Sequence, residues 1–287
     1  MRGDHTVRTE NPLRELIKSG KPTISTHVHT LWGGMAEVIG HTGVIDYIEF
    51  VSQYAPYDLF SLENFGRAID LFPHMTAMMK LDQEPRTYLA QRAVGAGIPN
   101  MLFADIRSVE DAKESVSAMK PDTPSARGTK GVSDSRNVGY VVPKITMADQ
   151  VRLYEEGVVA IMVEKRSAVE NLEQILAVPG IDMVQFGPGD YSVNIGMPGE
   201  TDHHEVQLAE RRTIETALNL GIRPRAEIQD WRDAERYTEM GVKDFAIGSD
   251  LETIYNFFQD HGGRLVEFLG RDYPEGGNPL PEVSNTH

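Results

Sequence analysis

Short apolar segments alternate with longer amphipathic ones along most of the chain. Such alternation of strand-length and helix-length patterns is typical of α/β proteins whose strands run parallel. We expect strands near residues 22–28, 46–52, 75–80, 99–104, 158–164, 182–187, 223–228 and 243–248. Helical patterns fall between and after them, over residues 35–41, 62–71, 87–96, 109–119, 148–156, 169–177, 205–220, 231–240 and 251–269.

Eight strand-helix units predict a closed (β/α)8 barrel, the TIM barrel fold. A glycine precedes several of the expected strands, where it suits the left-handed end of a helix; these are Gly97, Gly157, Gly180, Gly221 and Gly241. The alternative is an open, doubly wound sheet, but the glycine fingerprint of a dinucleotide site is missing after the first strand. We expect one barrel domain over 1–270 and a tail or subunit-contacting arm, rich in proline and glycine, over 271–287.

The composition is that of an acidic globular protein. Its 287 residues include 28 Lys and Arg against 43 Asp and Glu, a formal net charge of −15. This charge repels phosphate backbones and anionic lipids, so nucleic acid and membranes are not expected partners. The chain has no cysteine, which excludes disulfides and thiolate metal sites. It also lacks the apolar patterns of a secretory signal or a membrane span, so a cytoplasmic location is expected.

One connection, over residues 120–144, is much longer than the usual link between a strand and a helix. It carries five basic and two acidic residues inside an otherwise acidic protein. We consider two interpretations, a solvated surface loop and a lid or subunit-contact loop near a substrate that bears a carboxylate.

Two carboxylates stand where active sites form in such barrels, at the carboxyl ends of strands and in the loops that follow. Glu164 closes an apolar strand, and Asp190 follows the next strand in the turn Gly187-Pro188-Gly189-Asp190. A buried acid without a partner is costly, and neighbouring strand ends can direct two acids at one cation. A carboxylate pair completed by water and substrate oxygens suits Mg²⁺ or Mn²⁺. The alternative is a salt-bridged Glu164 beside a turn-forming Asp190.

The surrounding residues resemble those of the HpcH/HpaI aldolases, metal-dependent class II aldolases of the phosphoenolpyruvate/pyruvate barrel superfamily. The most specific segments are VEKRSAVENL and GPGDYS. The similarity extends to KPTISTHVHTLWGGMAEVIGHTG, to the AVGAG turn, to the Arg127-Gly128 pair and to AIGSDLETI, so that it covers roughly residues 12–270.

This resemblance implies that Glu164 and Asp190 are the protein's ligands of a divalent cation, Mg²⁺, Mn²⁺ or Co²⁺. It also implies a site for a 2-oxo acid such as pyruvate, formed by the Gly187-Pro188-Gly189 turn and by Arg127. Such an acid chelates the cation through its carboxylate and keto oxygens, so the cation stabilises the enolate formed when a carbon–carbon bond breaks. Relatives assemble as hexamers that exchange a C-terminal helix, so a homo-oligomer, a hexamer or a trimer, is expected.

The proton-transfer residues of the family are replaced in this chain. Typical members carry a His base after the second strand, where this chain has Tyr54 in VSQYAP, and the Asp that assists the base corresponds to Ala93. The Arg that polarises the keto oxygen is also missing, and the nearest cation is Lys80, which offers a point charge without the bidentate fork. Tyr54 and Lys80 are therefore catalytic candidates, with simple packing as the alternative for Tyr54.

Two histidines near the end of the first strand are further catalytic candidates. His27 and His29 lie on one face of the strand because side chains alternate, and an imidazole titrates near neutral pH. The alternative is that they are hydrogen-bonded histidines of the barrel mouth. For Glu49 and Asp105, at other strand positions, we expect structural ion pairs.

Three functions remain open from the sequence. The first is a lyase of the aldolase type that breaks or forms a carbon–carbon bond beside a 2-oxo acid. An aldehyde would be the second reactant. The second keeps the same metal enolate but performs decarboxylation, hydration or isomerisation, because the usual His-Asp dyad is lost. The third is a non-catalytic binding or assembly protein that retains the barrel.

The last helical pattern is strongly apolar near the C-terminus. It is expected either to be exchanged between subunits, as the resemblance implies, or to form the final barrel helix packed on its own chain. The residues concerned are Ile254, Phe257, Phe258, Leu265, Val266, Phe268 and Leu269.

Overall fold

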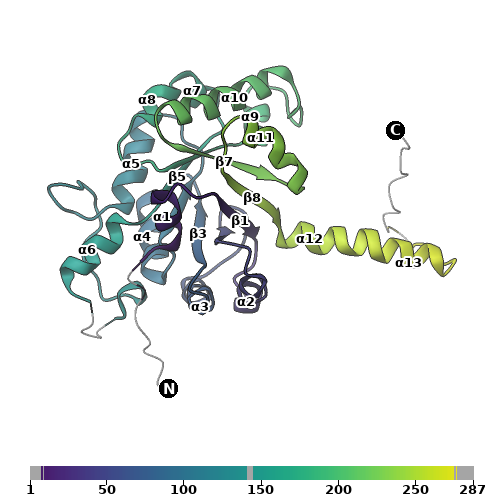
Figure 1. The fold of residues 1–287 in the computed structure, drawn as a ribbon, viewed down its shortest axis with the longest axis horizontal. Coiled ribbons are helices and arrows are strands. Elements are labelled where there is room, and N and C mark those ends of the chain that lie inside the picture. The colour runs from purple at the N-terminus through teal and green to yellow at the C-terminus, as the bar shows by residue number, and fades with distance from the viewer. Residues whose placement is uncertain (1–7, 9, 141–144, 275, 277–287) are drawn as a thin grey trace.

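The computed structural model describes residues 8, 10–140, 145–274 and 276. Eight parallel strands form a closed barrel in which each strand pairs with the next in sequence and β8 pairs with β1 (Figure 1). The strands are β1 (Thr23–Val28), β2 (Tyr47–Val51), β3 (Thr76–Leu81), β4 (Asn100–Phe103), β5 (Val159–Val163), β6 (Met183–Phe186), β7 (Arg223–Ile228) and β8 (Asp244–Ser249). The predicted (β/α)8 barrel is confirmed, and each strand lies within one residue of its expected bounds.

Helices surround the strands on the outside of the barrel (Figure 1). They are α2 (Gly33–Thr42), α3 (Leu59–Ile69), α4 (Arg86–Ala96), α5 (Val109–Met119), α6 (Met147–Glu155), α7 (Arg166–Glu170), α8 (Leu172–Leu176), α9 (Pro188–Asn194), α10 (His204–Asn219) and α11 (Ala234–Glu239). Strands β2 to β6 are buried along their whole length, as expected for a parallel sheet covered on both faces. Several helices end at a left-handed glycine, for example α4 at Gly97 with φ 98°.

Two helices were not expected from the sequence. The helix α1 (Pro12–Lys18) closes the amino-terminal end of the barrel, where Leu13 packs in one buried cluster with Met78 and Leu102. The turn predicted at Gly187 to Asp190 is instead the beginning of α9, with Pro188 in the first turn of the helix. Proline suits this position because the first helical N–H groups have no partner inside the helix.

The long connection after α5 lies at the amino-terminal ends of the strands, because α5 has already carried the chain back from the carboxyl end of β4. Lys120 Nζ donates to the carbonyl oxygens of Glu155 and Gly157, just before β5. The interpretation of this connection as a lid over the active site is therefore wrong for a single chain, because its described part borders the opposite end of the barrel. Residues 141–144 lie outside the described residues.

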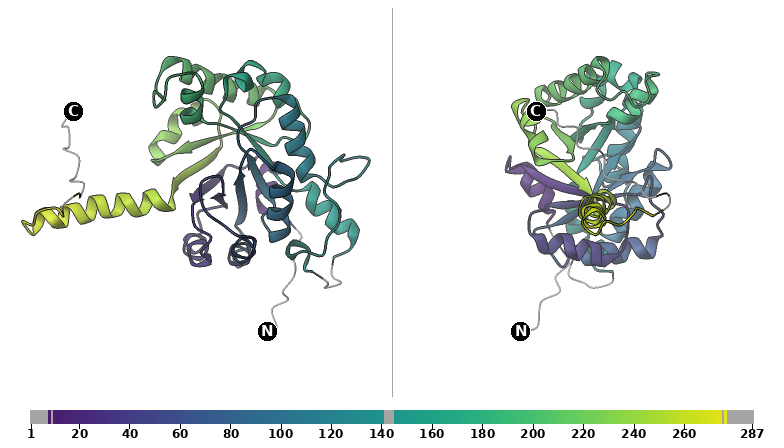
Figure 2. Two further views of the ribbon diagram at one scale, coloured as in Figure 1. Left: turned by 180° about the vertical axis from the view of Figure 1, so that it is seen from behind. Right: turned by 90° about the vertical axis from the view of Figure 1, so that its right-hand side faces the viewer.

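The last helix leaves the barrel instead of packing on it. Helix α12 (Asp250–Phe257), a π-helical segment (Phe258–Gly262) and α13 (Gly263–Phe268) form one continuous rod that projects away from the strands (Figure 2). The interpretation of this segment as a helix packed on its own barrel is therefore wrong. Most of the expected tail, residues 271–287, lies outside the described residues. In the described part of the chain, no helix is both long and apolar enough to cross a membrane.

Candidate active site

A cavity of about 520 Å³ opens at the carboxyl ends of the strands and continues between β7 and helices α10 and α11. Both predicted metal ligands, Glu164 and Asp190, line it, together with the segment Gly187–Gly189 and Lys80. The fold thus brings together residues that are separated by more than a hundred positions in the sequence. This end of the barrel is where catalytic groups gather in TIM barrels.

Glu164 follows β5 directly and is almost fully buried, with 2% of its surface exposed. Its Oε1 accepts a hydrogen bond of 2.6 Å from the backbone N–H of Asp105, whose left-handed φ of 55° is uncommon for a residue other than glycine. A side chain at Gly187 would place its Cβ 2.8 Å from Glu164 Oε2, so glycine makes room for the carboxylate. Burial raises the pKa of Glu164, and the nearby Asp190 raises it further.

Asp190 lies in the first turn of α9, and its side chain is half exposed to the cavity. Lys165, the residue after Glu164, places its Nζ 3.3 Å from Asp190 Oδ1 and 3.3 Å from Asp105 Oδ1. Burial alone would lower the pKa of Lys165, but Glu164, Asp190 and Asp105 together raise it. An ammonium group therefore stands among three carboxylates.

This donor set fits a divalent cation that keeps open coordination positions. Glu164 and Asp190 offer hard oxygen ligands, which Mg²⁺ and Mn²⁺ prefer. Within the described ranges, no group of three or more His, Asp or Glu side chains is arranged to hold a metal ion. Two carboxylates would leave the remaining positions to water and to substrate oxygens, and the ammonium of Lys165 marks the place as one that attracts positive charge.

A polar network fills the barrel below the cavity, where TIM barrels ordinarily hold apolar layers. Arg225 is fully buried and forms an ion pair with Glu49, while its Nη1 donates to Gln185 Oε1 at 2.8 Å. Burial would raise the pKa of Glu49, but Arg225, His27 and Lys80 lower it below its usual range. The ion pairs expected for Glu49 and Asp105 are confirmed, Asp105 pairing with Arg107 at 3.0 Å.

The two candidate histidines have different surroundings. His27 is enclosed by the network, with Nε2 3.3 Å from Arg225 Nη2 and 3.4 Å from Glu49, and Nδ1 3.5 Å from Glu227. His29 lies higher on the rim and is partly exposed. Its Nδ1 is 2.9 Å from Oδ1 of Asp250, a carboxylate that is only 2% exposed.

Asp250 is the residue that sequence reasoning missed. It is the first residue of α12, directly after β8, and both its carboxylate oxygens also accept the backbone N–H of His29, at 3.1 and 2.9 Å. Because β8 pairs with β1 in the closed barrel, the two residues become neighbours although 221 positions separate them. The signal in the sequence was an acid just beyond the end of a predicted strand, the same signal that pointed to Glu164.

The other predicted site residues lie in two places. Lys80, at 9% exposure, lines the cavity, and its Nζ lies 4.9 Å from the centre of the exposed Tyr54 ring. Arg127 does not reach the cavity. It is exposed in the connection between α5 and α6, at the opposite end of the barrel, so the structure does not bring it to Glu164 within one chain.

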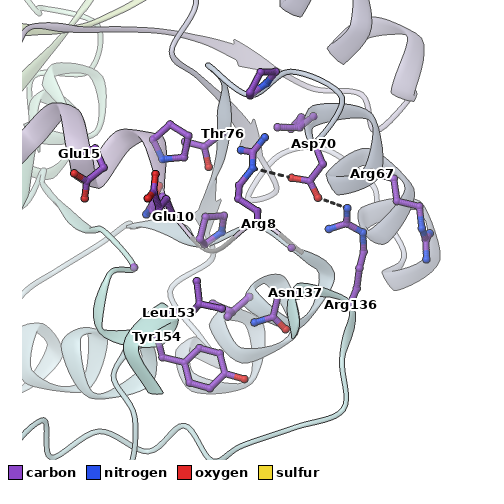
Figure 3. A pocket seen from close by; sticks show the side chains of 18 of the residues that line it. Arg8, Glu10, Glu15, Arg67, Asp70, Thr76, Arg136, Asn137, Leu153 and Tyr154 are labelled. Carbon is purple, nitrogen blue, oxygen red and sulfur yellow. Dashed lines mark hydrogen bonds and ion pairs between the residues drawn. The ribbon is translucent and has the colours of Figure 1, made fainter. Parts of the chain in front are cut away.

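A larger cavity, of about 770 Å³, lies at that opposite end (Figure 3). Three of its charged side chains are paired, because Asp70 contacts both Arg8 and Arg136. Arg8 further donates to the backbone oxygens of Met75 and Phe72. Asp70, Arg8 and Arg136 are thus engaged in holding the fold.

Comparison with known proteins identifies the family. A model of the HpcH/HpaI aldolase/citrate lyase family matches residues 69–256, more than half of the chain. The chain belongs to the HpcH/HpaI aldolase/citrate lyase family. It is therefore a carbon–carbon lyase of the class II aldolase type, a type that depends on a divalent metal.

Curated members of the HpcH/HpaI family align with most of this chain. A hydroxypyruvate/pyruvate aldolase of Delftia acidovorans is 27% identical over 255 residues, covering 85% of this chain and 88% of its own. A 4-hydroxy-2-oxo-heptane-1,7-dioate aldolase of Shigella boydii is 26% identical over 251 residues, covering 84% and 89%. The crystal structure of an HpcH/HpaI family protein from Burkholderia cenocepacia J2315 has the same fold, with a TM-score of 0.81, 22% identity and coverage of 89% and 99%.

Proposed function

We propose that this aldolase breaks and forms a carbon–carbon bond beside the keto group of pyruvate or hydroxypyruvate, with an aldehyde as the second reactant. The observation that carries the proposal is the pair Glu164 and Asp190, which lines one cavity at the carboxyl ends of the strands. The relatives named above support the substrate class, because the names of both contain a 2-oxo acid.

Glu164 and Asp190 would hold the divalent cation, Mg²⁺, Mn²⁺ or Co²⁺, with water and substrate in the other positions. When bound, the cation supplies positive charge beside the carboxylate and keto oxygens of the 2-oxo acid. The backbone of Gly187–Gly189 would receive the substrate carboxylate. A Cβ at Gly189 would meet no atom within 4 Å, so the wall of the cavity is open at this point.

We assign the proton transfer to His29, with Asp250 as its positioning residue. A carboxylate on Nδ1 favours the tautomer that leaves Nε2 free to accept a proton. In cleavage, Nε2 accepts the proton of the aldol hydroxyl as the carbon–carbon bond breaks. The hydroxyl carbon becomes the aldehyde and the bonding electron pair passes to the 2-oxo acid, whose carbon then takes the proton back from Nε2; in synthesis Nε2 removes that proton and delivers it to the aldehyde oxygen.

The remaining candidates support this assignment in different ways. Nε2 of His27 faces the buried Arg225 and Glu49, and its Nδ1 faces the half-exposed Glu227, so we propose that His27 helps to hold the floor of the site. Lys80 lines the cavity and its charge favours the ionised form of Glu164, so we propose that it orients the keto oxygen in place of the missing Arg. Tyr54 would hold Lys80 through the contact between its ring and the ammonium group.

The metal pair is tested with Glu164→Gln and Asp190→Asn. We expect each variant to bind Mn²⁺ more weakly. The rate of pyruvate release from 4-hydroxy-2-oxo acids, measured with a coupled assay, should fall by about a hundredfold or more. Glu170→Gln, on the exposed surface of α7, is the matched control and should behave as the wild type. If the protein binds Mn²⁺ but turns over no aldol of a 2-oxo acid, the proposed substrate class is wrong.

The acid–base assignment has a separate test. His29→Gln should retain Mn²⁺ affinity while kcat falls by about 10²- to 10⁴-fold, because only proton transfer is lost. Added imidazole should restore part of the turnover of His29→Ala, which a purely structural histidine would not allow. The exposed His204→Gln is the control. Unchanged kcat in His29→Gln would assign the proton transfer to another residue.

We also propose that the chain forms a homo-oligomer through α12 and α13. The rod leaves Ile24 of β1 exposed on the outside of its own barrel, and the same apolar rod of a second copy of the chain could cover it.

A cytoplasmic location stays a prediction, which cell fractionation tests.

A further inference from the structure

Lys165 occupies a position for which the proposed function provides no role. It is the residue that precedes α7, and its side chain turns back over the end of β5 into the cluster of acids. Its Nζ is 3.3 Å from one oxygen of Asp190 and 3.3 Å from one oxygen of Asp105. The side chain is largely buried, so this is not a solvated surface pair.

A divalent cation shared by Glu164 and Asp190 needs the same carboxylate that Lys165 now contacts. Cation–oxygen distances of about 2.0 to 2.6 Å bring the ion close to the ammonium group. Two positive charges at that separation repel each other strongly, more so in a partly buried site than in water. The ammonium must therefore give up Asp190 when the cation binds, and Asp105 remains available to hold it.

We propose that Lys165 is an internal competitor of the divalent cation: it neutralises Asp190 in the metal-free protein and sets the affinity for the metal by the energy needed to displace it. The inference rests on the proposed metal site and assigns to a residue of this chain the role of setting the metal affinity. The positive charge of Lys165 explains how the acidic barrel mouth is stable before a cation binds, although Glu164 is only 2% exposed to solvent.

Arg107 provides a matched comparison within the same cluster. It carries the same charge and contacts Asp105 at 3.0 Å, and in the described part of the chain its side-chain ion pair is with Asp105 and not with Asp190. If the general field of nearby positive charge mattered, removal of Arg107, which is more exposed than Lys165, would also tighten the binding of the metal. If direct competition for Asp190 matters, Lys165 has the larger effect.

The experiment measures Mn²⁺ binding by calorimetry on chelator-treated full-length protein, without substrate. We expect Lys165→Met and Lys165→Gln to bind Mn²⁺ about tenfold more tightly than the wild type. Lys165→Arg keeps the charge and should not bind more tightly, and Arg107→Gln should change the Kd by less than about threefold. Two neutral variants are used so that poor folding of one does not end the test.

Two results would overturn the inference while leaving the metal site intact. One is a wild-type Kd that neither Lys165→Met nor Lys165→Gln improves. The other is an equal gain in Arg107→Gln, which would show a general field without competition for Asp190. If neither the wild type nor any variant binds Mn²⁺, the carboxylate pair is not a metal site, and the proposed function fails together with this inference.

Discussion

Arg225 and Glu49 form an ion pair that is buried at the centre of the barrel, with Ser25, Gln185 and His27 around it. Charges buried in this way are costly unless each is paired and hydrogen-bonded. Here the partners come from four different strands, so the network ties opposite sides of the barrel together. Single residues of this network are therefore sensitive positions for stability.

Glu49→Gln should lower the free energy of unfolding by about 3 to 5 kcal/mol at pH 7, because Arg225 would remain buried without its counter-charge. The pKa of Glu49 is lower in the folded than in the unfolded protein. Its contribution to stability is therefore complete above the pKa of the unfolded state and is lost as the pH falls through the pKa of the folded state. The difference between variant and wild type should therefore shrink in acid. Urea unfolding at several pH values measures it.

The control for Glu49→Gln is Glu63→Gln, which removes a carboxylate that pairs with Arg67 on the surface of α3. Such a surface pair is worth about 0 to 1 kcal/mol. Equal losses in the two variants would contradict the importance given to the buried pair.

Lys130 has the opposite effect on stability from Glu49, because its charge destabilises the fold. Burial lowers the pKa of Lys130 to about 8, with a further contribution from Arg92, and its Nζ lies 4.6 Å from the centre of the Tyr154 ring. The unfolded chain binds this proton more tightly, so Lys130 reduces stability below pH 8 and the penalty disappears as the pH rises toward 10.5.

Lys130→Met should therefore raise the free energy of unfolding by roughly 2 kcal/mol at pH 7, a figure reduced to allow for solvent screening and the lost ring contact. The gain should decline between pH 8 and 10. Denaturant unfolding of variant and wild type across this range measures it. A gain that does not depend on pH would point to packing instead of charge.

At the scale of elements, the rod of α12 and α13 is the part of the molecule that a single chain does not explain. Many apolar side chains on it are exposed, whereas a barrel normally covers β8 and β1 with its last helix. The helix also begins at Asp250, which holds His29, so the anchor of the rod and the proposed acid–base pair share one residue. Burial of the rod against another copy would accordingly fix the helix start beside the site.

Phe268→Asp should shift the protein toward smaller assemblies, because a charge would enter the proposed interface. Phe268 is 85% exposed in the single chain. Phe60, which is 83% exposed at the start of α3, is a matched control, and Phe60→Asp should leave the assembly unchanged. Light scattering after size exclusion measures the mass. An unchanged mass in Phe268→Asp would place the interface elsewhere.

At the scale of the whole molecule, the net charge of −15 sets the conditions for binding an anionic 2-oxo acid. A divalent cation at the proposed site would reverse the field at the barrel mouth and so favour an anionic substrate in an acidic protein. A cation held by Glu164 and Asp190 would also offset the repulsion between the two carboxylates, which contributes to the raised pKa of Glu164 in the metal-free protein.

Metal binding should therefore stabilise the whole fold. Mn²⁺ at ten times its Kd is expected to add about 1.4 kcal/mol, which corresponds to a rise of a few degrees in Tm. A chelator should reverse the rise, and Glu164→Gln should not respond to the metal. Scanning calorimetry measures the shift. An equal rise in Glu164→Gln would place the ion at another site.

The sequence by itself determined the eight strands and most helices, because hydrophobic periodicity is a local property and each segment carried its own period. It also pointed to Glu164 and Asp190, since an acid at the end of an apolar strand is conspicuous without any partner. Helices α1 and α9 were missed because both are short and begin with a proline that reads as a turn.

Only the tertiary structure decided which of these residues meet. Closure of the barrel joins β8 to β1 and so pairs Asp250 with His29. The return path of α5 puts Arg127 at the far end, and the direction of α12 takes an apolar helix away from its own barrel. These outcomes depend on how elements distant in sequence pack against one another, and no local pattern contains that information.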